Sequence, residues 1–184
     1  MLVPIAPPSF DVDIDLRYAT PDNLAGVAIY RKPVCLLAPE AASALGRAAE
    51  LARGIGCRLC VYDAFRPVEA QWRLWEALPD PAYIADPRQG SNHSRGVAVD
   101  LTLADADGTP LDMGTGFDDM TERSHHARTD LPAEMQRNRA LLLGVMSAAG
   151  WAHYAMEWWH YELPDAARFP LLTDRAVGGL MLSA

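Results

Sequence analysis

The feature that most constrains the fold is the order in which helical and strand-like segments follow one another along the 184 residues. Three segments are rich in helix-forming residues between ordinary start and stop signals: residues 40–53, 67–78 and 132–149. Proline precedes the first segment and opens the second, as is common at helix N-termini. Asp130 can cap the third segment, which Gly150 closes. The sequence therefore predicts helices at these three places.

Between the predicted helices lie segments whose composition favours strands. Residues 11–18 alternate polar and apolar side chains, which is typical of a half-buried strand. Further strands are expected at three places: residues 57–63, residues 96–103 and the aromatic-rich run 151–163. Loops are expected where proline, glycine, serine, asparagine and aspartate gather: residues 79–92, 105–108 and 111–120.

This order of elements favours one class of fold. Because helices come first and the later strands cluster, we expect an α+β fold with a small, mainly antiparallel sheet and flanking helices. The chain contains no repeat, no low-complexity tract and no linker, so residues 1–184 are predicted to form a single domain. Half of the residues are hydrophobic, which is enough to build a core without disulfides.

Charge and hydrophobicity argue against some classes of partner. The formal net charge is −8, whereas binding of nucleic-acid phosphates requires a basic surface. The first ten residues, MLVPIAPPSF, contain three prolines and no basic residue, so they do not resemble a signal peptide. No stretch approaches the ~18 apolar residues of a membrane span. We therefore expect a cytoplasmic protein with neither a nucleic-acid nor a membrane partner, and the oligomeric state stays open.

The three cysteines, Cys35, Cys57 and Cys60, are interpreted as structural residues. Cys57 and Cys60 form a single CxxC pair, but a metal site of that kind needs a second pair or a nearby histidine. The odd number of cysteines does not suggest a disulfide framework. Since the segment around the pair is a predicted buried strand, cysteine serves there as a small apolar residue.

Two of the five histidines stand close in sequence to acidic residues. His93 precedes Asp100 by seven residues, and His160 follows Glu157 by three. A catalytic zinc site commonly has three protein ligands, histidines together with one carboxylate, and an open position for water. His93, Asp100 and His160 would supply that set for one Zn²⁺ per chain. Composition and spacing alone leave open the alternative that these are ordinary core or surface residues.

Glu157 would act as a general base and acid beside such a metal. The attacking water must lose a proton and the leaving amine must gain one, and a neighbouring carboxylate can carry that proton. On a regular strand, however, residues 157 and 160 would face opposite ways, as would residues 93 and 100. The site therefore requires a bend near residues 158–159 and a turn at Gly96.

Five sequence blocks resemble the D-alanyl-D-alanine dipeptidases and the related zinc D,D-peptidases. The block SNHSRGVAVDLTL resembles their SxHxxGxAxD motif, and EWWHY resembles their ExWH motif. VYDAFRP is similar to a family strand segment that ends in Arg-Pro, and DLRYATPDNLAG and MGTGFDDMTERSHH are similar to dipeptidase-specific blocks. The blocks follow in the family's order from about residue 11 to about residue 163, so the resemblance covers most of the chain.

The resemblance implies roles for individual residues. His93, Asp100 and His160 match the zinc ligands, and Glu157 matches the general base and acid. Arg66 matches an arginine that stabilises the tetrahedral oxyanion together with the metal. This role is physically sound, because a fixed cation aimed at developing charge has most effect in a dry site.

The resemblance also indicates how the substrate is held. Asp118 resembles an acid that receives the free amino group of the substrate, although the neighbouring Asp119 leaves this assignment open by one position. Ser91 matches the serine of the motif and either contacts the substrate or orients the loop. The remaining histidines are expected to lie in loops, at the pocket edge, in the core or on the surface: His125, His126 and His153.

The function implied by the resemblance is zinc-dependent hydrolysis of a small D-amino-acid dipeptide, typically D-Ala-D-Ala, to free amino acids. The nearest alternative is a zinc D,D-carboxypeptidase or an L-Ala-D-Glu-type peptidase acting on cell-wall peptides, which would need an open cleft. A third alternative is a non-catalytic zinc-binding protein, which would have no reason to keep Glu157 and Arg66. The native metal stays open, because several divalent ions bind two histidines and an aspartate.

Overall fold

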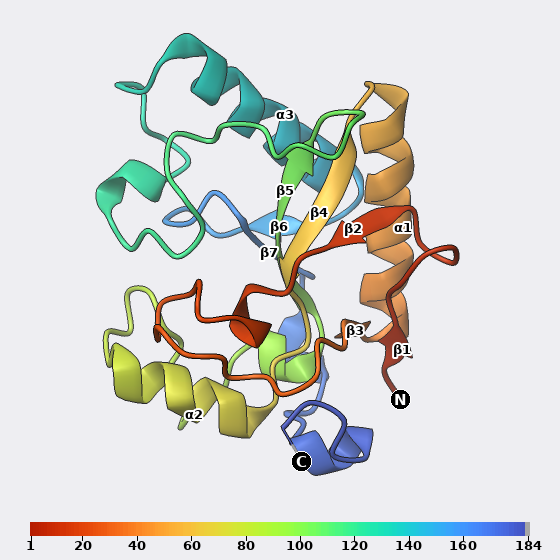
Figure 1. The fold of residues 1–184 in the computed structure, drawn as a ribbon, viewed down its shortest axis with the longest axis vertical. Coiled ribbons are helices and arrows are strands. Elements are labelled where there is room, and N and C mark those ends of the chain that lie inside the picture. Colours follow the sequence, from red (N-terminus) through yellow and green to blue (C-terminus); the bar gives the residue numbers. More distant parts are fainter. Residues whose placement is uncertain (183–184) are drawn as a thin grey trace.

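The centre of the molecule is a five-stranded sheet, seen in the computed structural model, which describes residues 1–182 (Figure 1). Its strands, in spatial order, are β2 (Val12–Ile14), β4 (Arg58–Asp63), β5 (Ala98–Ala104), β7 (His160–Glu162) and β6 (Ala152–His153). β2 runs parallel to β4, and the other neighbouring strands of this sheet are antiparallel. The α+β fold with a mainly antiparallel sheet is confirmed.

The helices are α1 (Pro39–Gly54), α2 (Val68–Ala77) and α3 (Ala133–Ala148), and each end lies one residue from its predicted bound. The predicted cap of α3 is wrong, because the helix begins after Pro132 without a side-chain cap. The Asp130 carboxylate instead accepts two hydrogen bonds from the Arg128 guanidinium, at 2.8 and 2.7 Å. This bidentate pair holds the carboxylate beside Arg128, two residues before the N-cap residue Pro132.

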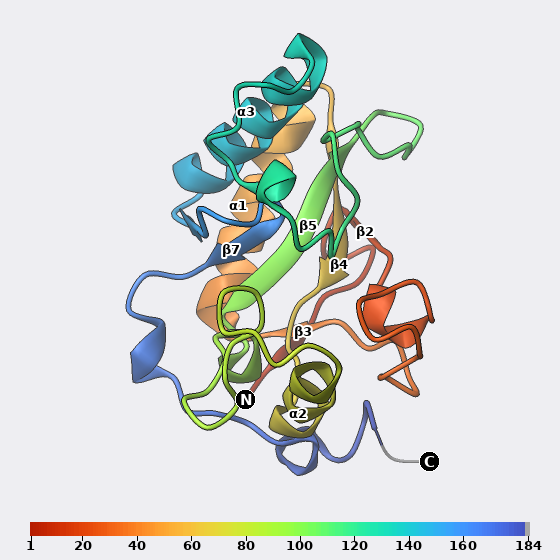
Figure 2. The same cartoon turned by 90° about the vertical axis from the view of Figure 1, so that its left-hand side faces the viewer.

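α1 and α3 cover the same face of the sheet (Figure 2). Along β5, Val99, Leu101 and Leu103 belong to the main hydrophobic core, which also includes an alanine-rich face of α1. Small side chains on that helix face let it approach the strands closely. Since side chains alternate along a strand, Asp100 points to the opposite face, away from both helices. This opposite face carries the site described below.

Two predicted strands differ from the structure. β2 covers only part of residues 11–18 and is followed by a 3-10 turn, Arg17–Ala19. The prediction of one strand over residues 151–163 is wrong, because β6 and β7 are separated by a turn that includes the expected bend. Loop contacts hold this turn, since Trp158 N donates to Ser124 O at 3.1 Å. An aromatic-rich sequence does not distinguish such a turn from a strand.

Smaller elements complete the described part of the chain. β1 (Val3–Pro4) and β3 (Leu36–Leu37) pair in an antiparallel two-stranded sheet. Further 3-10 turns lie at His93–Arg95, Glu122–Ser124, Ala166–Arg168 and Asp174–Val177. A second hydrophobic core beside α2 includes Leu74, Phe65 and Ile84. No helix in residues 1–182 combines the length and apolar character needed to cross a membrane.

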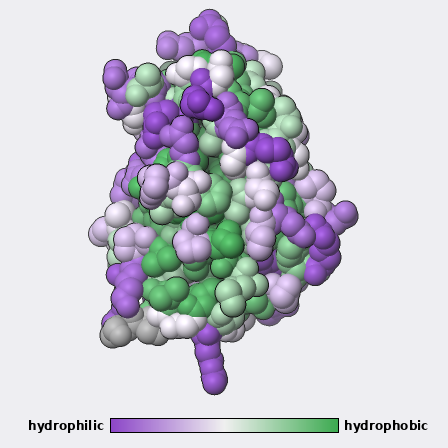
Figure 3. Space-filling view, turned by 90° about the vertical axis from the view of Figure 1, so that its right-hand side faces the viewer, coloured by the Kyte–Doolittle hydropathy of each residue, from purple (hydrophilic) through white to green (hydrophobic). Residues whose placement is uncertain are grey.

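The surface is mixed in character. On the face shown in Figure 3, hydrophilic side chains dominate the upper part, and hydrophobic side chains gather in the lower part. Large apolar side chains that are exposed include Val27, Leu51, Ile55 and Leu180. Folded proteins ordinarily expose apolar residues of this kind, so they do not by themselves indicate an interface.

Candidate metal centre

The register of the sheet aligns three polar residues in one row. Asp100 on β5 pairs with Asp63 on β4 and with His160 on β7. Residues directly opposite each other on antiparallel strands share a face of the sheet, so the three side chains lie on the face away from α1 and α3. Asp63 and Asp100 are buried, at 0% and 2% exposed, and the His160 side chain is 14% exposed. Long-range strand pairing therefore places two acids and a histidine side by side.

His93 reaches this row from the 3-10 turn that precedes β5. Gly96 ends the turn with a φ of 69°, in the left-handed region that favours glycine. A Cβ at this position would lie 2.7 Å from the Leu2 side chain and 3.3 Å from the Ala38 nitrogen. The predicted turn at Gly96 is present, and it lets His93 and Asp100 point to the same place although they are seven residues apart.

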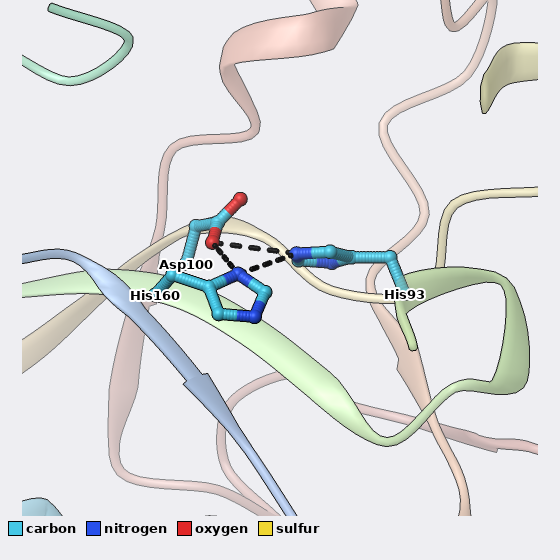
Figure 4. Close-up of side chains that lie close together, drawn as sticks. All are labelled: His93, Asp100 and His160. Atoms are coloured by element: carbon cyan, nitrogen blue, oxygen red, sulfur yellow. Dashed lines mark hydrogen bonds and ion pairs between the residues drawn. The ribbon is translucent and has the colours of Figure 1, made fainter. Parts of the chain in front are cut away.

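Three potential metal-ligand atoms, one each from His93, Asp100 and His160, converge beside this row of residues (Figure 4). His93 Nε2 lies 3.2 Å from His160 Nδ1 and 3.3 Å from Asp100 Oδ1. His160 Nδ1 lies 3.0 Å from the same carboxylate oxygen. Ligand atoms at the corners of a tetrahedron with zinc bonds of ~2.05 Å would be ~3.3 Å apart. The three atoms are therefore spaced as ligands of a single metal ion.

Neighbouring acceptors fix the direction in which both imidazoles present their lone pairs. His93 Nδ1 donates to Ala64 O at 2.7 Å, and His160 Nε2 lies 3.3 Å from a Glu162 carboxylate oxygen. With those protons turned outward, the other ring nitrogens present lone pairs to the Asp100 carboxylate. Three electron-rich atoms at such distances repel one another unless a proton or a metal cation lies between them. The residues present therefore fit a divalent metal ion.

The electrostatics of the row also favour positive charge. Burial by itself would lower the pKa of His160, but its hydrogen bonds with Asp100 and Glu162 raise that pKa to about 10. Burial would likewise raise the pKa of Asp100, but the charges and hydrogen bonds of His93 and His160 hold it well below its usual range. Asp100 is thus an ionised carboxylate, as a metal ligand must be.

Glu157 lies in the turn between β6 and β7 and lines the same pocket as the three donor residues. Its side chain is buried, with 6% of the residue exposed. Burial raises the pKa of Glu157 to about 8, with Asp100 and Asp118 adding to the rise and His160 and Arg66 opposing it. A carboxylate with such a pKa exchanges protons readily near neutral pH.

Arg66 is held rigidly beside the centre. Its Nε and Nη2 atoms each lie 2.8 Å from Asp63 Oδ2, and Nη1 donates to Gln71 Oε1 at 3.0 Å. Nη2 is also 3.4 Å from Asp100 Oδ2. Tyr30 donates its hydroxyl proton to Asp63 Oδ1 at 2.8 Å. The sequence reasoning missed Asp63, Tyr30 and Gln71, of which only Asp63 carried a signal, as the acid in the VYDAFRP block.

Asp118 lines the pocket, whereas Asp119 does not. The backbone of Asp118 has a φ of 61°, which aspartate tolerates better than most residues. Tyr18 OH donates to Oδ1 at 3.0 Å, and Leu24 N donates to Oδ2 at 2.9 Å. Burial raises the pKa of Asp118 to about 6. Of the two aspartates between which the sequence did not decide, Asp118 is the one placed to meet a ligand.

Ser91 also lines the pocket, and its Oγ accepts the His93 amide at 3.2 Å, which orients the histidine loop. The other histidines lie outside the pocket lining. His126 stacks edge-to-face with His153, with ring centroids 5.0 Å apart. All three cysteines are free, and none belongs to the candidate metal site found in residues 1–182.

The pocket that these residues line has a volume of about 220 Å³. This is below the ~300–1,000 Å³ usual for sites of drug-sized ligands, so it suits a very small molecule. A larger hollow of about 670 Å³ shares Asp118 with it but contains none of the three donor residues. The chemistry therefore belongs to the smaller pocket.

Two imidazoles and a carboxylate can hold a metal here, and a buried glutamate and a fixed guanidinium lie beside them. Such a site combines a Lewis acid, a proton carrier and an oxyanion-stabilising cation, which amide hydrolysis requires. The fold and the site thus define a metal-dependent peptidase. The chain belongs to the D-alanyl-D-alanine dipeptidase family, since the family model described as D-ala-D-ala dipeptidase matches residues 1–177.

Individual relatives are consistent with this membership. The chain is 50% identical to the D-alanyl-D-alanine dipeptidase of Escherichia coli strain K12 over 165 residues, which cover 90% of this chain and 86% of the relative. It is 35% identical to the proteins of that name from Enterococcus faecium and Streptomyces coelicolor. Each of these two matches covers 82% of this chain and 85% of the relative.

Proposed function

We propose that this protein is a zinc-dependent dipeptidase that hydrolyses D-Ala-D-Ala, or a similar small D-amino-acid dipeptide, to free amino acids. The observation that carries the proposal is the convergence of three donor atoms in the pocket that also holds Glu157 and Arg66. The shared name of the relatives supports the choice of substrate. The proposal includes one Zn²⁺ per chain, a single domain over residues 1–184 and a cytoplasmic location.

His93, Asp100 and His160 would hold the zinc ion, which supplies a Lewis acid that polarises the scissile carbonyl and acidifies water. Glu157 accepts a proton from the attacking water on a carboxylate oxygen and then delivers it to the nitrogen of the leaving amine. Its raised pKa makes the carboxylate basic enough to accept that proton. With a dication held beside it, Glu157 would have a pKa closer to neutrality, so its carboxyl could also deliver the proton.

Arg66 stabilises the negative charge that develops on the carbonyl oxygen. Its guanidinium is fixed by Asp63 and Gln71 and cannot turn away from the pocket without breaking those hydrogen bonds. A preorganised cation costs little reorganisation when charge develops, and its effect is largest where water is excluded. Removal of such a group typically slows a reaction ~10²- to 10³-fold.

Asp118 anchors the free amino group of the dipeptide. The ammonium is a cation, and the carboxylate faces the pocket with Tyr18 and Leu24 holding both of its oxygens. Ser91 orients the loop of His93 and contributes to the pocket wall. The small pocket disfavours the carboxypeptidase and endopeptidase alternatives, which need room for longer peptides. The presence of Glu157 and Arg66 disfavours a non-catalytic zinc protein.

Metal content and substrate range test this proposal together. The purified protein is assayed for zinc and offered D-Ala-D-Ala, L-Ala-L-Ala and a pentapeptide ending in D-Ala-D-Ala. We expect about one zinc per chain, as set by the three-ligand site, and cleavage of the D,D-dipeptide alone. Efficient cleavage of the pentapeptide would favour the carboxypeptidase alternative. Absence of bound metal would contradict the central proposal.

Two variants separate the metal ligands from the proton carrier. Glu157→Ala should lower kcat by ~10²-fold or more while zinc stays bound, because Glu157 is not a ligand. His93→Ala should lose both zinc and activity. His153→Ala is the matched control, since this exposed histidine lies outside the pocket and should keep both. Loss of zinc in Glu157→Ala, or normal zinc in His93→Ala, would show that the roles are misassigned.

A further inference from the structure

The pocket is covered by a short turn, residues 81–85, which we call the roof and whose five residues all line the cavity. Ala82 N donates to Asp80 Oδ1 at 2.9 Å, and Ile84 N donates to Asp80 O at 2.8 Å. Ile84 is 3% exposed and is buried in the second core beside α2. The roof is therefore a defined turn with its own anchor and not a loose loop.

Two side chains attach the roof to the walls of the pocket. Gln71 on α2 donates to Ala85 O at 2.8 Å, and its other amide atom accepts a hydrogen bond from Arg66. From the opposite wall, Tyr154 OH donates to Ala82 O at 3.0 Å. Within residues 1–182, this is the hydrogen bond that joins the roof to the turn between β6 and β7.

Tyr154 is positioned by the turn between β6 and β7, which also carries Glu157. Its amide donates to His160 O at 3.1 Å, and its carbonyl accepts the Glu157 amide at 3.3 Å. Its ring packs edge-to-face against the His160 imidazole, with centroids 5.9 Å apart. The hydroxyl that reaches Ala82 is thus positioned relative to Glu157 and His160, and the bond joins the turn between β6 and β7 to the roof.

We propose that the Tyr154–Ala82 hydrogen bond determines substrate length, which makes Tyr154 a specificity-determining residue of this site. This inference rests on the proposed dipeptidase function. With the bond formed, the cavity keeps its volume of about 220 Å³, which suits a dipeptide. A third amino-acid residue enters only when the roof lifts, and lifting costs this bond. One hydrogen bond of ordinary net strength shifts such an opening equilibrium by ~2- to 10-fold.

The test compares a dipeptide with a tripeptide that keeps both charged ends. Values of kcat/KM for D-Ala-D-Ala and D-Ala-D-Ala-D-Ala are measured for the zinc-loaded wild type, Tyr154→Phe, Tyr154→Ala and the control Tyr83→Phe. Tyr83 lines the same pocket and has no side-chain hydrogen bond to the described residues. We expect the tripeptide-to-dipeptide ratio to rise ~3- to 10-fold in Tyr154→Phe, and further in Tyr154→Ala. Tyr83→Phe should keep the wild-type ratio.

A second measurement does not depend on turnover. Amide hydrogen exchange of Tyr83 and Ile84, whose amides both bond to Asp80 O, should speed up in Tyr154→Phe by a similar ~3- to 10-fold, with or without zinc. An unchanged ratio together with unchanged exchange in a folded Tyr154→Phe protein would overturn the role of Tyr154. A wild type that cleaves neither peptide would instead overturn the proposed function and this inference with it.

Discussion

At the scale of single residues, Asp118 shows how binding competes with stability. Its carboxylate is half-buried, and burial raises its pKa to about 6. The folded protein therefore holds a proton on Asp118 more tightly than the unfolded chain, where aspartate has a pKa of ~3.9. As the pH rises through this window, the folded state loses stability relative to the unfolded state. A carboxylate kept at such a cost is typical of a functional position.

Asp118→Asn should stabilise the protein near neutral pH and weaken substrate binding. The expected gain in the free energy of unfolding is absent near pH 4 and reaches ~1–2 kcal/mol above pH 6, since solvent screens part of the cost. Asparagine also tolerates the φ of 61° at this position. KM for the dipeptide should rise ~10-fold or more, because the ammonium loses its partner.

Urea unfolding of metal-free protein at several pH values measures the stability effect, and steady-state kinetics of zinc-loaded protein measures KM. Asp119→Asn serves as the control, because Asp119 does not line the pocket. A pH-independent stability difference between wild type and Asp118→Asn would contradict the assigned burial cost. An unchanged KM would remove Asp118 from the binding site.

At the scale of elements, α3 holds the irregular segment that carries Asp118. Arg139 on this helix is 3% exposed, and its Nε donates to Met113 O at 2.6 Å. Its Nη1 donates to His125 O at 3.0 Å, on the far side of Asp118 in the sequence. One guanidinium thus ties down both ends of the segment and replaces the ladder of hydrogen bonds that a strand would provide.

Arg139→Met should destabilise this segment and impair binding more than chemistry. Two carbonyls would lose buried donors, at a cost of ~2–4 kcal/mol, which corresponds to a fall in Tm of roughly 4–16 °C for a chain of this size. KM should rise several-fold with a smaller change in kcat, because Asp118 moves while the metal ligands stay in place. Thermal unfolding measures the fall in Tm, and steady-state kinetics measures KM and kcat.

Arg137→Met is the matched control, since Arg137 is exposed on the same helix. Equal effects of the two substitutions would refute the role of Arg139.

At the scale of the whole molecule, the metal would connect parts of the chain that are far apart in sequence. His93 precedes β5, Asp100 lies within it, and His160 begins β7. A ligand that binds only the folded state stabilises it by ~2.7 kcal/mol when present at 100 times its Kd. A metal bound at this site would therefore contribute to folding as well as to chemistry.

Removing the metal with a chelator should lower the Tm of the wild type by roughly 5–10 °C, and added zinc should restore it. Differential scanning fluorimetry with and without chelator measures this change in Tm. His93→Ala, which lacks a ligand, should show the same Tm under both conditions. An equal response of His93→Ala and wild type to the chelator would mean that the stabilising metal binds elsewhere.

The sequence by itself determined the helices, the turn at Gly96 and the residues of the metal cluster. Helix ends depend on neighbouring residues such as Pro39 and Gly54, so a local pattern is enough to predict them. The donor residues were recognisable because motif blocks keep them at fixed spacing. Asp118 and Asp119 could not be separated in this way, since one step in sequence decides which side chain faces the pocket.

Only the tertiary structure decided how these residues meet. Strand register aligns Asp63, Asp100 and His160, and no spacing within one segment encodes a pairing between strands about 40 to 60 residues apart. The segment from β6 to β7 is a turn because Ser124 and His126, more than 25 residues earlier, supply its hydrogen-bond partners. The contact between Tyr154 and Ala82 has the same origin. Local sequence sets what each segment can form, whereas burial and pairing across the fold select which side chains share the pocket.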